Sequence, residues 1–281
     1  MRSLSSPVNN AFTVDVEDWY HVCGMGGQTV PPRHSWRVEA NVGKILALLE
    51  RCRCRATFFM LGSVAESNPE LAPMISAKGH EIASHGYSHT LLSGMDHQQF
   101  RDELLRTERI LIEQTGQRPV GYRAPQWSVS PLTPWVDEVL AEHGYLYDSS
   151  RSPLPFVGDA SGPRHPFRIA TAHGVLWEIP PMVTPTRLVN LPSAGGWGFR
   201  LFPLAMVRAT IERYQREESP AVLYLHPREV DPDGPRLRLS PLKRFAAYGT
   251  RADAAPRISA LLERFRFTPL REMVAAWPSV S

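Results

Sequence analysis

The stretch Thr13-Val14-Asp15-Val16-Glu17-Asp18 ends an apolar run that begins at Ala11, and it holds three carboxylates within a span of four residues. Carboxylates so close together repel each other unless a cation or a proton separates them. The apolar run is typical of a buried strand, and its acidic end falls where a parallel sheet or barrel presents its reactive groups. The stretch therefore predicts a first strand with a candidate site at its end.

A second stretch, Ser84-His85-Gly86-Tyr87-Ser88-His89, supplies two imidazoles four residues apart. This spacing places both rings on one face of a helical turn, and each ring can offer a neutral nitrogen to a divalent metal ion. Two histidines and one carboxylate leave positions open on the metal, as a hydrolytic metal site requires. Zinc is the ion we expect, with cobalt or another divalent ion as the alternative. The residues alone leave open which upstream carboxylate completes the set.

Apolar runs alternate with helix-like segments along most of the chain, which predicts an α/β protein with a parallel sheet or a barrel. The rhythm breaks between 149 and 203, where Pro and Gly are frequent and long loops with short strands are expected. Strands are expected at Ala11–Val16, Ala56–Leu61, His80–Ser84, Val120–Arg123, Tyr145–Asp148 and Ala221–Leu225; helices are expected at Val38–Cys52, Pro69–Ala77, Asp96–Gln114, Pro134–His143, Leu204–Arg216, Ser240–Ala247, Ala254–Phe265 and Leu270–Ala276.

The 281 residues and the 43% apolar fraction suffice for one large domain. We expect a single domain over 1–281, with a loop-rich insertion at about 149–203 and a helical C-terminal extension at about 240–281. A net charge of +3 without a basic run gives no reason to expect nucleic acid as a partner. Met1–Asn10 has no apolar core, and no apolar run is long enough to span a membrane, so a cytoplasmic location without a signal peptide is expected.

Further polar residues end other apolar runs. Arg123 is either a surface arginine or a guanidinium that holds a carboxylate ionised and in one orientation. His226 follows an apolar run and precedes a proline; it is either a hydrogen-bonded core histidine or a proton donor to a leaving amine. Asp148 or Glu178 could orient its ring. The histidines without such a context, His21 among them, are expected on the surface.

Together these motifs resemble the polysaccharide deacetylase family, the carbohydrate esterases with a NodB-type homology domain. The resemblance implies a distorted (β/α) barrel of about seven parallel strands that removes N-acetyl groups from a polysaccharide or oligosaccharide. Gly195 to Arg200 and Leu225 to Pro232 are similar to a narrower branch that accompanies exosortase-linked exopolysaccharide gene clusters. The stretches that match the family are Thr13 to Asp18, Ser84 to His89, Arg123 to Trp127, Tyr147-Asp148 and Leu223 to His226.

The resemblance also implies a role for each matching residue. Asp15 would be the catalytic base, tethered by Arg123, and His226 would be the acid. Asp18, His85 and His89 would be the metal ligands. The family usually has two adjacent aspartates, whereas Val16-Glu17 intervene here, so Glu17 is the alternative to Asp18. The residues expected to contact the substrate are Tyr87, through its backbone amide, Pro125, Trp127 and Leu225.

Two other functions stay open at this stage. Trp19-Tyr20 stands where the family has Gly-Pro after its acidic pair, and a groove of altered shape would suit an amidohydrolase that acts on a small cyclic amide or ureide. A carbohydrate-binding protein that retains the barrel without catalysis is the other alternative. The sequence gives no indication of the oligomeric state.

Overall fold

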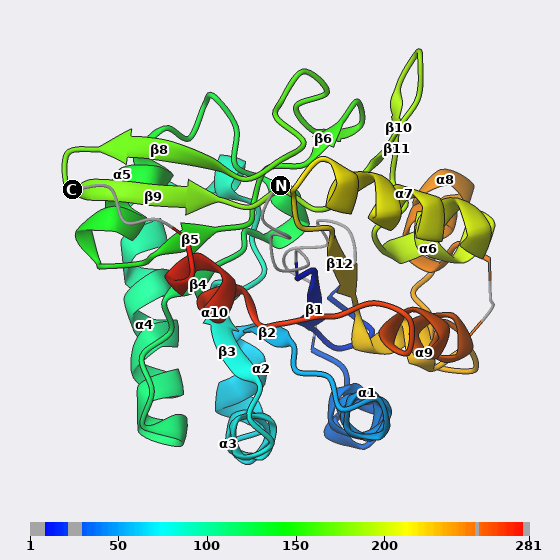
Figure 1. The fold of residues 1–281 in the computed structure, drawn as a ribbon. Helices are drawn as coiled ribbons and strands as arrows, with labels where there is room; N and C mark the ends of the chain where they lie inside the picture. Colours follow the sequence, from blue (N-terminus) through cyan, green and yellow to red (C-terminus); the bar gives the residue numbers. More distant parts are fainter. Residues whose placement is uncertain (1–8, 22–29, 251–252, 278–281) are drawn as a thin grey trace.

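The computed structural model describes residues 9–21, 30–250 and 253–277. Its main sheet has eight strands in the order β12-β1-β2-β3-β4-β5-β9-β8, and neighbours from β12 to β9 run parallel (Figure 1). β8 pairs antiparallel to β9. The strands are β1 (Ala11–Val16), β2 (Thr57–Met60), β3 (Glu81–Ser84), β4 (Gly121–Tyr122), β5 (Tyr147–Asp148), β8 (Phe167–Thr171), β9 (Gly174–Glu178) and β12 (Val222–Leu225).

The expected α/β class with about seven parallel strands is therefore confirmed. The sheet curls into a half-barrel, since no pairing joins β12 to β8 within the described ranges. Every residue of β1, β2 and β3 is buried. Parallel strands covered on both faces need such apolar runs, which explains why the sequence pattern located these three strands well.

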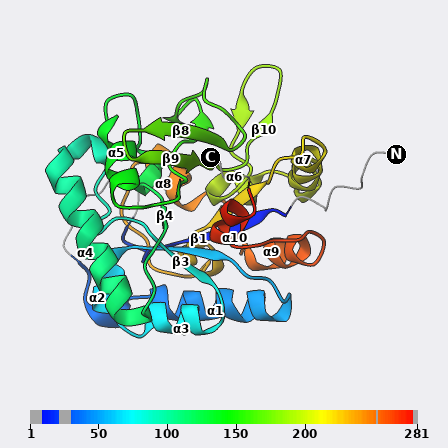
Figure 2. The same cartoon turned by 60° about the vertical axis from the view of Figure 1, so that its left-hand side comes forward.

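Helices cover the convex side and the ends of the sheet (Figure 2). The longest, α4, begins after a capping box between Asp96 and Gln99 and ends at Gly116, whose φ of 68° suits a left-handed helix cap. The helices are α1 (Val38–Arg51), α2 (Gly62–Ser67), α3 (Leu71–Ala77), α4 (His97–Thr115), α5 (Trp135–Glu142), α6 (Gly196–Leu201), α7 (Leu204–Arg216), α8 (Pro241–Tyr248), α9 (Ala255–Leu262) and α10 (Leu270–Ala275). Short 3-10 helices are η1 (Arg33–Ser35), η2 (Leu92–Gly94), η3 (Pro125–Trp127) and η4 (Pro227–Val230).

The segment 149–203 contributes more regular structure than its composition predicts. β9 joins the main sheet beside β5, and β8 extends that edge as a hairpin. The segment also contains helix α6 and two small hairpins, β6 (Pro153–Leu154) with β7 (Val157–Gly158) before β8, and β10 (Thr184–Pro185) with β11 (Asn190–Leu191) after β9. α2 and α6 were not expected, because six-residue helices that begin with glycine lack a clear periodic pattern.

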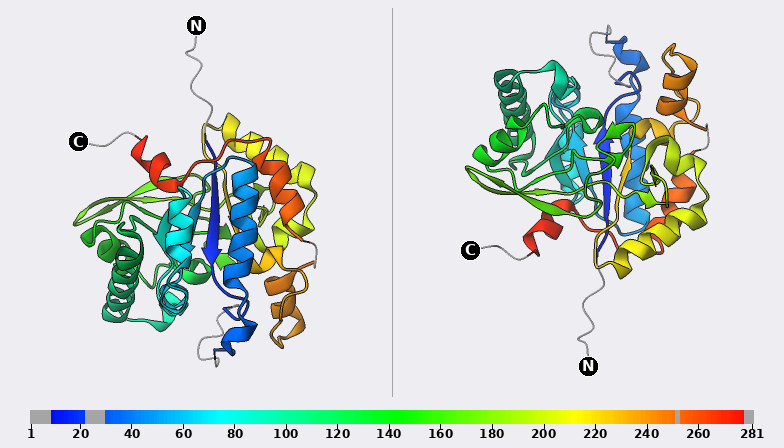
Figure 3. Two further views of the ribbon diagram at one scale, coloured as in Figure 1. Left: turned by 90° about the horizontal axis from the view of Figure 1, so that it is seen from below. Right: turned by 90° about the horizontal axis from the view of Figure 1, so that it is seen from above.

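The carboxyl ends of β1, β3, β4, β5 and β12 meet at one end of the molecule. In the left panel of Figure 3 the dark blue arrow of β1 points to this end, where α8 lies in orange. In (β/α) folds the loops after the strands build the site. The fold therefore gathers the polar residues that follow these strands, as the sequence predicted.

None of the helices in the described ranges is long and apolar enough to cross a membrane. Residues 1–8, on which the expectation about a signal peptide largely depends, lie outside those ranges.

A glycine in β4 tests how closely the central strands pack. A Cβ at Gly121 would lie 1.9 Å from Cζ of Tyr147, so we expect Gly121→Ala to lower the free energy of unfolding by about 1–3 kcal/mol or more. Gly43, in the exposed face of α1, is the matched control, because a Cβ there meets no atom within 4 Å. Gly43→Ala should stabilise the protein by about 0.5–1 kcal/mol. Denaturant unfolding of both variants measures the difference, and equal midpoints would contradict the packing described.

Candidate functional site

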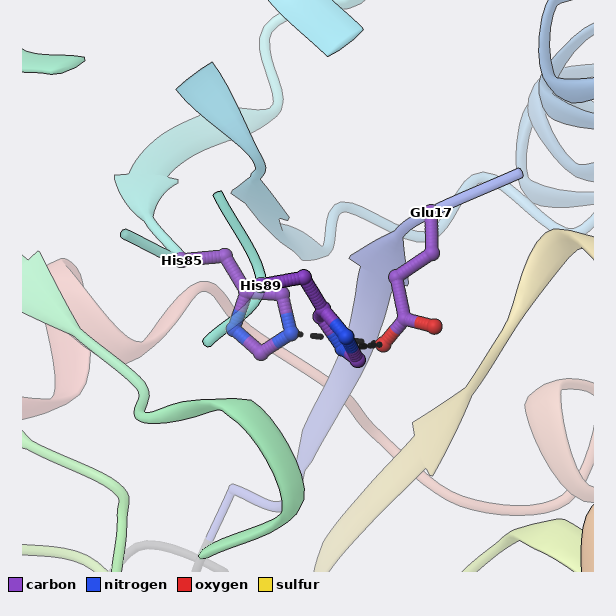
Figure 4. Close-up of side chains that lie close together, drawn as sticks. All are labelled: Glu17, His85 and His89. Carbon is purple, nitrogen blue, oxygen red and sulfur yellow. Dashed lines mark hydrogen bonds and ion pairs between the residues drawn. The ribbon is translucent and has the colours of Figure 1, made fainter. Parts of the chain in front are cut away.

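Three buried side chains, Glu17, His85 and His89, point toward one another at the carboxyl ends of β1 and β3 (Figure 4). Oε1 of Glu17 lies 3.0 Å from Nε2 of His89 and 3.4 Å from Nε2 of His85. One ligand atom from each residue lies within 4.8 Å of the other two. Two imidazole nitrogens and a carboxylate oxygen are donors that suit zinc and related divalent ions. The donor set therefore fits a metal ion.

The two histidines converge through a loop, and the expectation of a helical turn is wrong. Residues 85–90 form no helix, and Gly86 and His89 both have positive φ angles, 73° and 61°. Glu103 of α4 fixes the loop, because its Oε2 accepts hydrogen bonds from the backbone N–H groups of Tyr87 at 3.2 Å and Ser88 at 3.1 Å. A non-glycine residue at positive φ is strained, which is common where a site holds a side chain in place.

A backbone contact places a proton on Nδ1 of His85. Its Nδ1 lies 2.8 Å from the carbonyl oxygen of Arg123. A carbonyl oxygen only accepts hydrogen bonds, so Nδ1 carries a proton, and in the neutral ring Nε2 faces the cluster with a lone pair. This is the tautomer that a metal ligand needs.

The charge on Glu17 also suits a cation. Burial alone would raise the pKa of this carboxyl, but the neighbouring histidines outweigh burial and hold the pKa well below its usual value. Arg228 donates from Nη1 to Oε2 of Glu17 at 3.0 Å. Oε2 of Glu17 is therefore bound to Arg228, while Oε1 faces the two histidines.

Asp18 does not belong to this cluster, and that part of the expected ligand set is wrong. Its carboxylate accepts hydrogen bonds from the backbone N–H groups of Trp19 at 2.7 Å and Arg37 at 3.0 Å. It therefore holds the loop after β1 against the start of α1. The strand period of two places Asp15 and Glu17 on one face and Asp18 on the other, a signal that favoured the alternative ligand.

Asp15 and Arg123 form a buried ion pair beside the cluster, as expected. Nη1 of Arg123 donates to Oδ1 of Asp15 at 2.7 Å and to Oγ1 of Thr13 at 2.8 Å. The guanidinium also donates to the carbonyl and hydroxyl oxygens of Ser149, at 3.1 and 2.8 Å, and lies 4.0 Å from the ring centre of Phe59. A guanidinium with no exposed surface needs such hydrogen-bond partners. Because these partners hold the guanidinium in place, its contact with Asp15 fixes that carboxylate in one orientation.

His226 faces the same place from β12. Its Nε2 lies 3.9 Å from Oδ2 of Asp15 and 3.8 Å from Oε1 of Glu17. Its Nδ1 lies 2.8 Å from Oε1 of Glu229, which is three residues further along the chain. Burial opposes ionisation of Glu229, but the His226 contact and nearby arginines outweigh burial and lower its pKa. Glu229 therefore orients the His226 ring.

The expectation that Asp148 or Glu178 orients His226 is wrong. Both carboxylates are fully buried and bind Arg151 instead, at 3.3 and 2.9 Å. Burial raises the pKa of Asp148 to about 6 and raises that of Glu178 well above its usual value. Glu229 was missed, although a proline after His226 and an acid at the third position are typical of a capped helix start.

Asp15, Glu17, His89 and His226 line a cavity of about 170 Å³. Trp127 lines it as expected, with its ring centre 4.5 Å from that of Tyr224. His21 also lines it and was wrongly expected on the surface; burial lowers the pKa of its ring to about 3. The cavity lining consists of Asp15, Glu17, His21, His89, Ala124, Gln126, Trp127, Leu154, Phe156, Val157, Pro192, Gly196, Trp197, Tyr224, His226, Arg228, Ala246 and Ala247.

Three residues expected to contact substrate do not line this cavity. The Tyr87 amide is already bound by Glu103, and its hydroxyl donates to Glu66 at 2.6 Å. Pro125 is buried at the start of η3 and Leu225 is buried in the core. Adjacent residues, Gln126 and Tyr224 among them, line the cavity instead, and a substrate contact by these three residues stays a prediction.

The fold and the site define an α/β half-barrel with a candidate metal centre. Residues 32–147 match the family described as polysaccharide deacetylase, and residues 149–275 match a domain of unknown function, DUF3473. A peptidoglycan deacetylase from Helicobacter pylori is 35% identical over 128 residues, which cover 44% of this chain and 43% of that protein. A peptidoglycan-N-acetylglucosamine deacetylase from Bacillus cereus is 38% identical over 82 residues, covering 29% of this chain and 30% of that protein.

A solved structure from Mycobacterium smegmatis, described as a candidate polysaccharide deacetylase, is 27% identical with a TM-score of 0.57. The match covers 84% of this chain and 76% of that chain. The curated relatives are matched over less than half of their own length. Residues 32–147 are therefore similar to the polysaccharide deacetylase family, and the fold resembles that of the solved structure.

The zinc affinities of two variants test whether Glu17 or Asp18 is the metal ligand. We expect Glu17→Gln to weaken zinc binding by at least about 100-fold, since losing a group that only orients a ligand already costs about 10–100-fold. Asp18→Asn, the matched control, should change zinc affinity much less, because its carboxylate binds backbone N–H groups. Competition with a chromophoric chelator measures both affinities. A larger loss for the Asp18 variant would restore Asp18 as the ligand.

Proposed function

We propose that this protein is a metal-dependent hydrolase that removes N-acetyl groups from a saccharide containing N-acetylhexosamine. The observation that carries the proposal is the approach of Glu17 Oε1 to both His85 and His89, with Asp15 and His226 beside it. A protein that only binds carbohydrate has no need for a base and an acid placed around a metal-type cluster. The family match of residues 32–147 supports the same reaction.

Glu17, His85 and His89 would hold the ion, and zinc is the ion we propose. A divalent ion held there would polarise the acetamide carbonyl and lower the pKa of water beside it. The lone pair on His85 Nε2 and the ionised state of Glu17 prepare the two side chains for this role.

The remaining groups handle the protons. Asp15 accepts the proton that water loses as it adds to the carbonyl carbon, and Arg123 keeps that carboxylate in place. His226 gives a proton to the nitrogen as the C–N bond breaks, which leaves acetate and a free amine. Glu229 accepts the hydrogen bond from the other ring nitrogen and so keeps Nε2 directed at the cavity. The separation of 3.9 Å between His226 and Asp15 allows both to reach one acetamide.

The cavity walls support a sugar ring as substrate. Trp127, Tyr224 and Trp197 place aromatic surface beside the acidic groups, and such surfaces accept the apolar faces of a ring. An exopolysaccharide or its precursor is the substrate we propose, on the similarity of Gly195–Arg200 to the exosortase-linked branch. We also propose that the chain forms one domain, because β9 and β12, both within residues 149–275, pair with β5 and β1 of the preceding part of the chain.

The proposed base is tested by Asp15→Asn. We expect acetate release from N-acetylglucosamine oligomers to fall by about 10²–10⁴-fold, the usual contribution of a positioned proton acceptor. Zinc affinity should stay close to that of the unchanged protein, because Asp15 contacts Arg123 and not the ligand cluster. Acetate is measured by a coupled assay, before and after treatment with a chelator. Undiminished acetate release from the variant would refute the role of Asp15.

The orientation of His226 gives a separate prediction. Glu229→Gln keeps the size of the side chain but removes its charge, and we expect the kcat of deacetylation to fall about 10–100-fold. Asp148→Asn is the control, since Asp148 binds Arg151 rather than His226. Steady-state kinetics are compared after thermal unfolding shows that both variants are folded. A larger kcat loss for the Asp148 variant would reinstate Asp148 as the orienting acid.

A further inference from the structure

The segment 235–250, which contains α8, is basic and largely exposed. It carries Arg236, Arg238, Lys243 and Arg244, and it has no acidic residue between the flanking Asp233 and Asp253. Arg238, Lys243 and Arg244 are exposed, and none of the three forms a salt bridge within the part of the chain that the structure describes. The segment therefore presents uncompensated positive charge.

Apolar side chains are exposed on the same helix. Leu242 is 80% exposed and Phe245 is 41% exposed. They are three residues apart, so they lie on one face of α8. Burying a leucine or phenylalanine side chain lowers the free energy by about 1.5–3 kcal/mol relative to leaving it in water. Leu242 and Phe245 would gain this free energy only on contact with another apolar surface. Lys243 and Arg244 flank this apolar pair around the helix, and the four residues Leu242, Lys243, Arg244 and Phe245 are together called the α8 face below.

The α8 face continues to the mouth of the cavity. The Phe245 ring lies 5.2 Å from that of Trp197, and Trp197 lies 6.2 Å from Phe156, which is 58% exposed. Trp197 and Phe156 both line the cavity, as does Ala246. Leu242 lies one helical turn before Ala246, so the apolar stripe of α8 runs outward from the cavity wall.

We propose that the α8 face docks on an anionic lipid bilayer. Leu242 and Phe245 insert among the headgroups, while Lys243 and Arg244 lie near the lipid phosphates. A surface with apolar side chains beside cations matches a bilayer interface, where both kinds of group find a partner. A soluble anionic polymer would satisfy the cations but leave the leucine and phenylalanine in water.

Docking in this way would bring the cavity mouth to the headgroup region. If the proposed deacetylase function holds, the saccharide presented there is one anchored to a lipid. The docking itself does not depend on that function, because it uses residues of the α8 face and none of the groups assigned to catalysis.

Vesicle co-sedimentation of the full chain tests the proposal. The probes are vesicles of phosphatidylcholine alone and vesicles of phosphatidylcholine mixed with phosphatidylglycerol. We expect binding to the mixed vesicles that weakens at high salt, and little binding to the neutral ones. Combined Lys243→Gln and Arg244→Gln should weaken binding about 30-fold, and Leu242→Asp should weaken it at least as much.

Leu105→Asp is the matched control, since Leu105 is 37% exposed on α4, on the opposite side of the sheet from α8 in Figure 1 and Figure 3. That variant should bind mixed vesicles as the unchanged protein does. Equal loss in the Leu105 and Leu242 variants, or no binding to mixed vesicles, overturns the proposal. So does binding to a soluble anionic polysaccharide without binding to vesicles. Acetate release from soluble oligomers, measured on the same variants, should be unchanged and reports separately on the deacetylase function.

Discussion

A fully buried guanidinium, that of Arg123, is the constraint on which the site depends. An arginine cannot lose its charge inside the protein, so the fold must surround it with acceptors. Its side chain binds Asp15 from β1 and Ser149 after β5, and its backbone carbonyl binds His85 after β3. One residue thus fixes the direction of a carboxylate and the tautomer of an imidazole. The candidate base and a candidate metal ligand are positioned relative to each other by the same residue.

The surroundings of each acid near this centre, rather than its residue type, decide whether its pKa is lowered or raised. Glu17 lies among histidines and keeps a charge, and Glu229 does so beside His226. Asp148 and Glu178 share one arginine in the buried interior, and burial raises the pKa of both. The first two can act on a ligand or a proton in the cavity. The second pair instead ties β5 to β9 through Arg151, which makes it part of the framework.

The segment that matches a domain of unknown function completes both the sheet and the cavity. β9 and β12 add strands to opposite ends of the row formed by β1 to β5. The β6–β7 hairpin, α6 and α8 supply walls through Leu154, Trp197 and Ala247. The chain before residue 149 holds the candidate metal ligands Glu17, His85 and His89, while His226 comes from residues 149–275. The proposed chemistry therefore needs both segments, and the exposed α8 face belongs to the segment that shapes the entrance.

The sequence by itself determined the α/β class, the buried strands β1, β2 and β3, and the presence of Asp15, His85, His89 and Arg123 at one end of the sheet. It could do so because continuous apolar runs and residues just after them depend on local pattern. Tertiary structure decided that Glu17 rather than Asp18 faces the histidines, and that Glu229 orients His226. Those choices depend on where the chain turns after a strand: the backbone N–H of Glu17 donates to the carbonyl of Asp15 at 2.9 Å, and the loop after His85 is shaped by Glu103 of a distant helix. Local patterns favoured Glu17 and Glu229 but did not decide between the acids, because the direction of a side chain beyond a strand end also depends on the turn of the backbone and on contacts with distant elements.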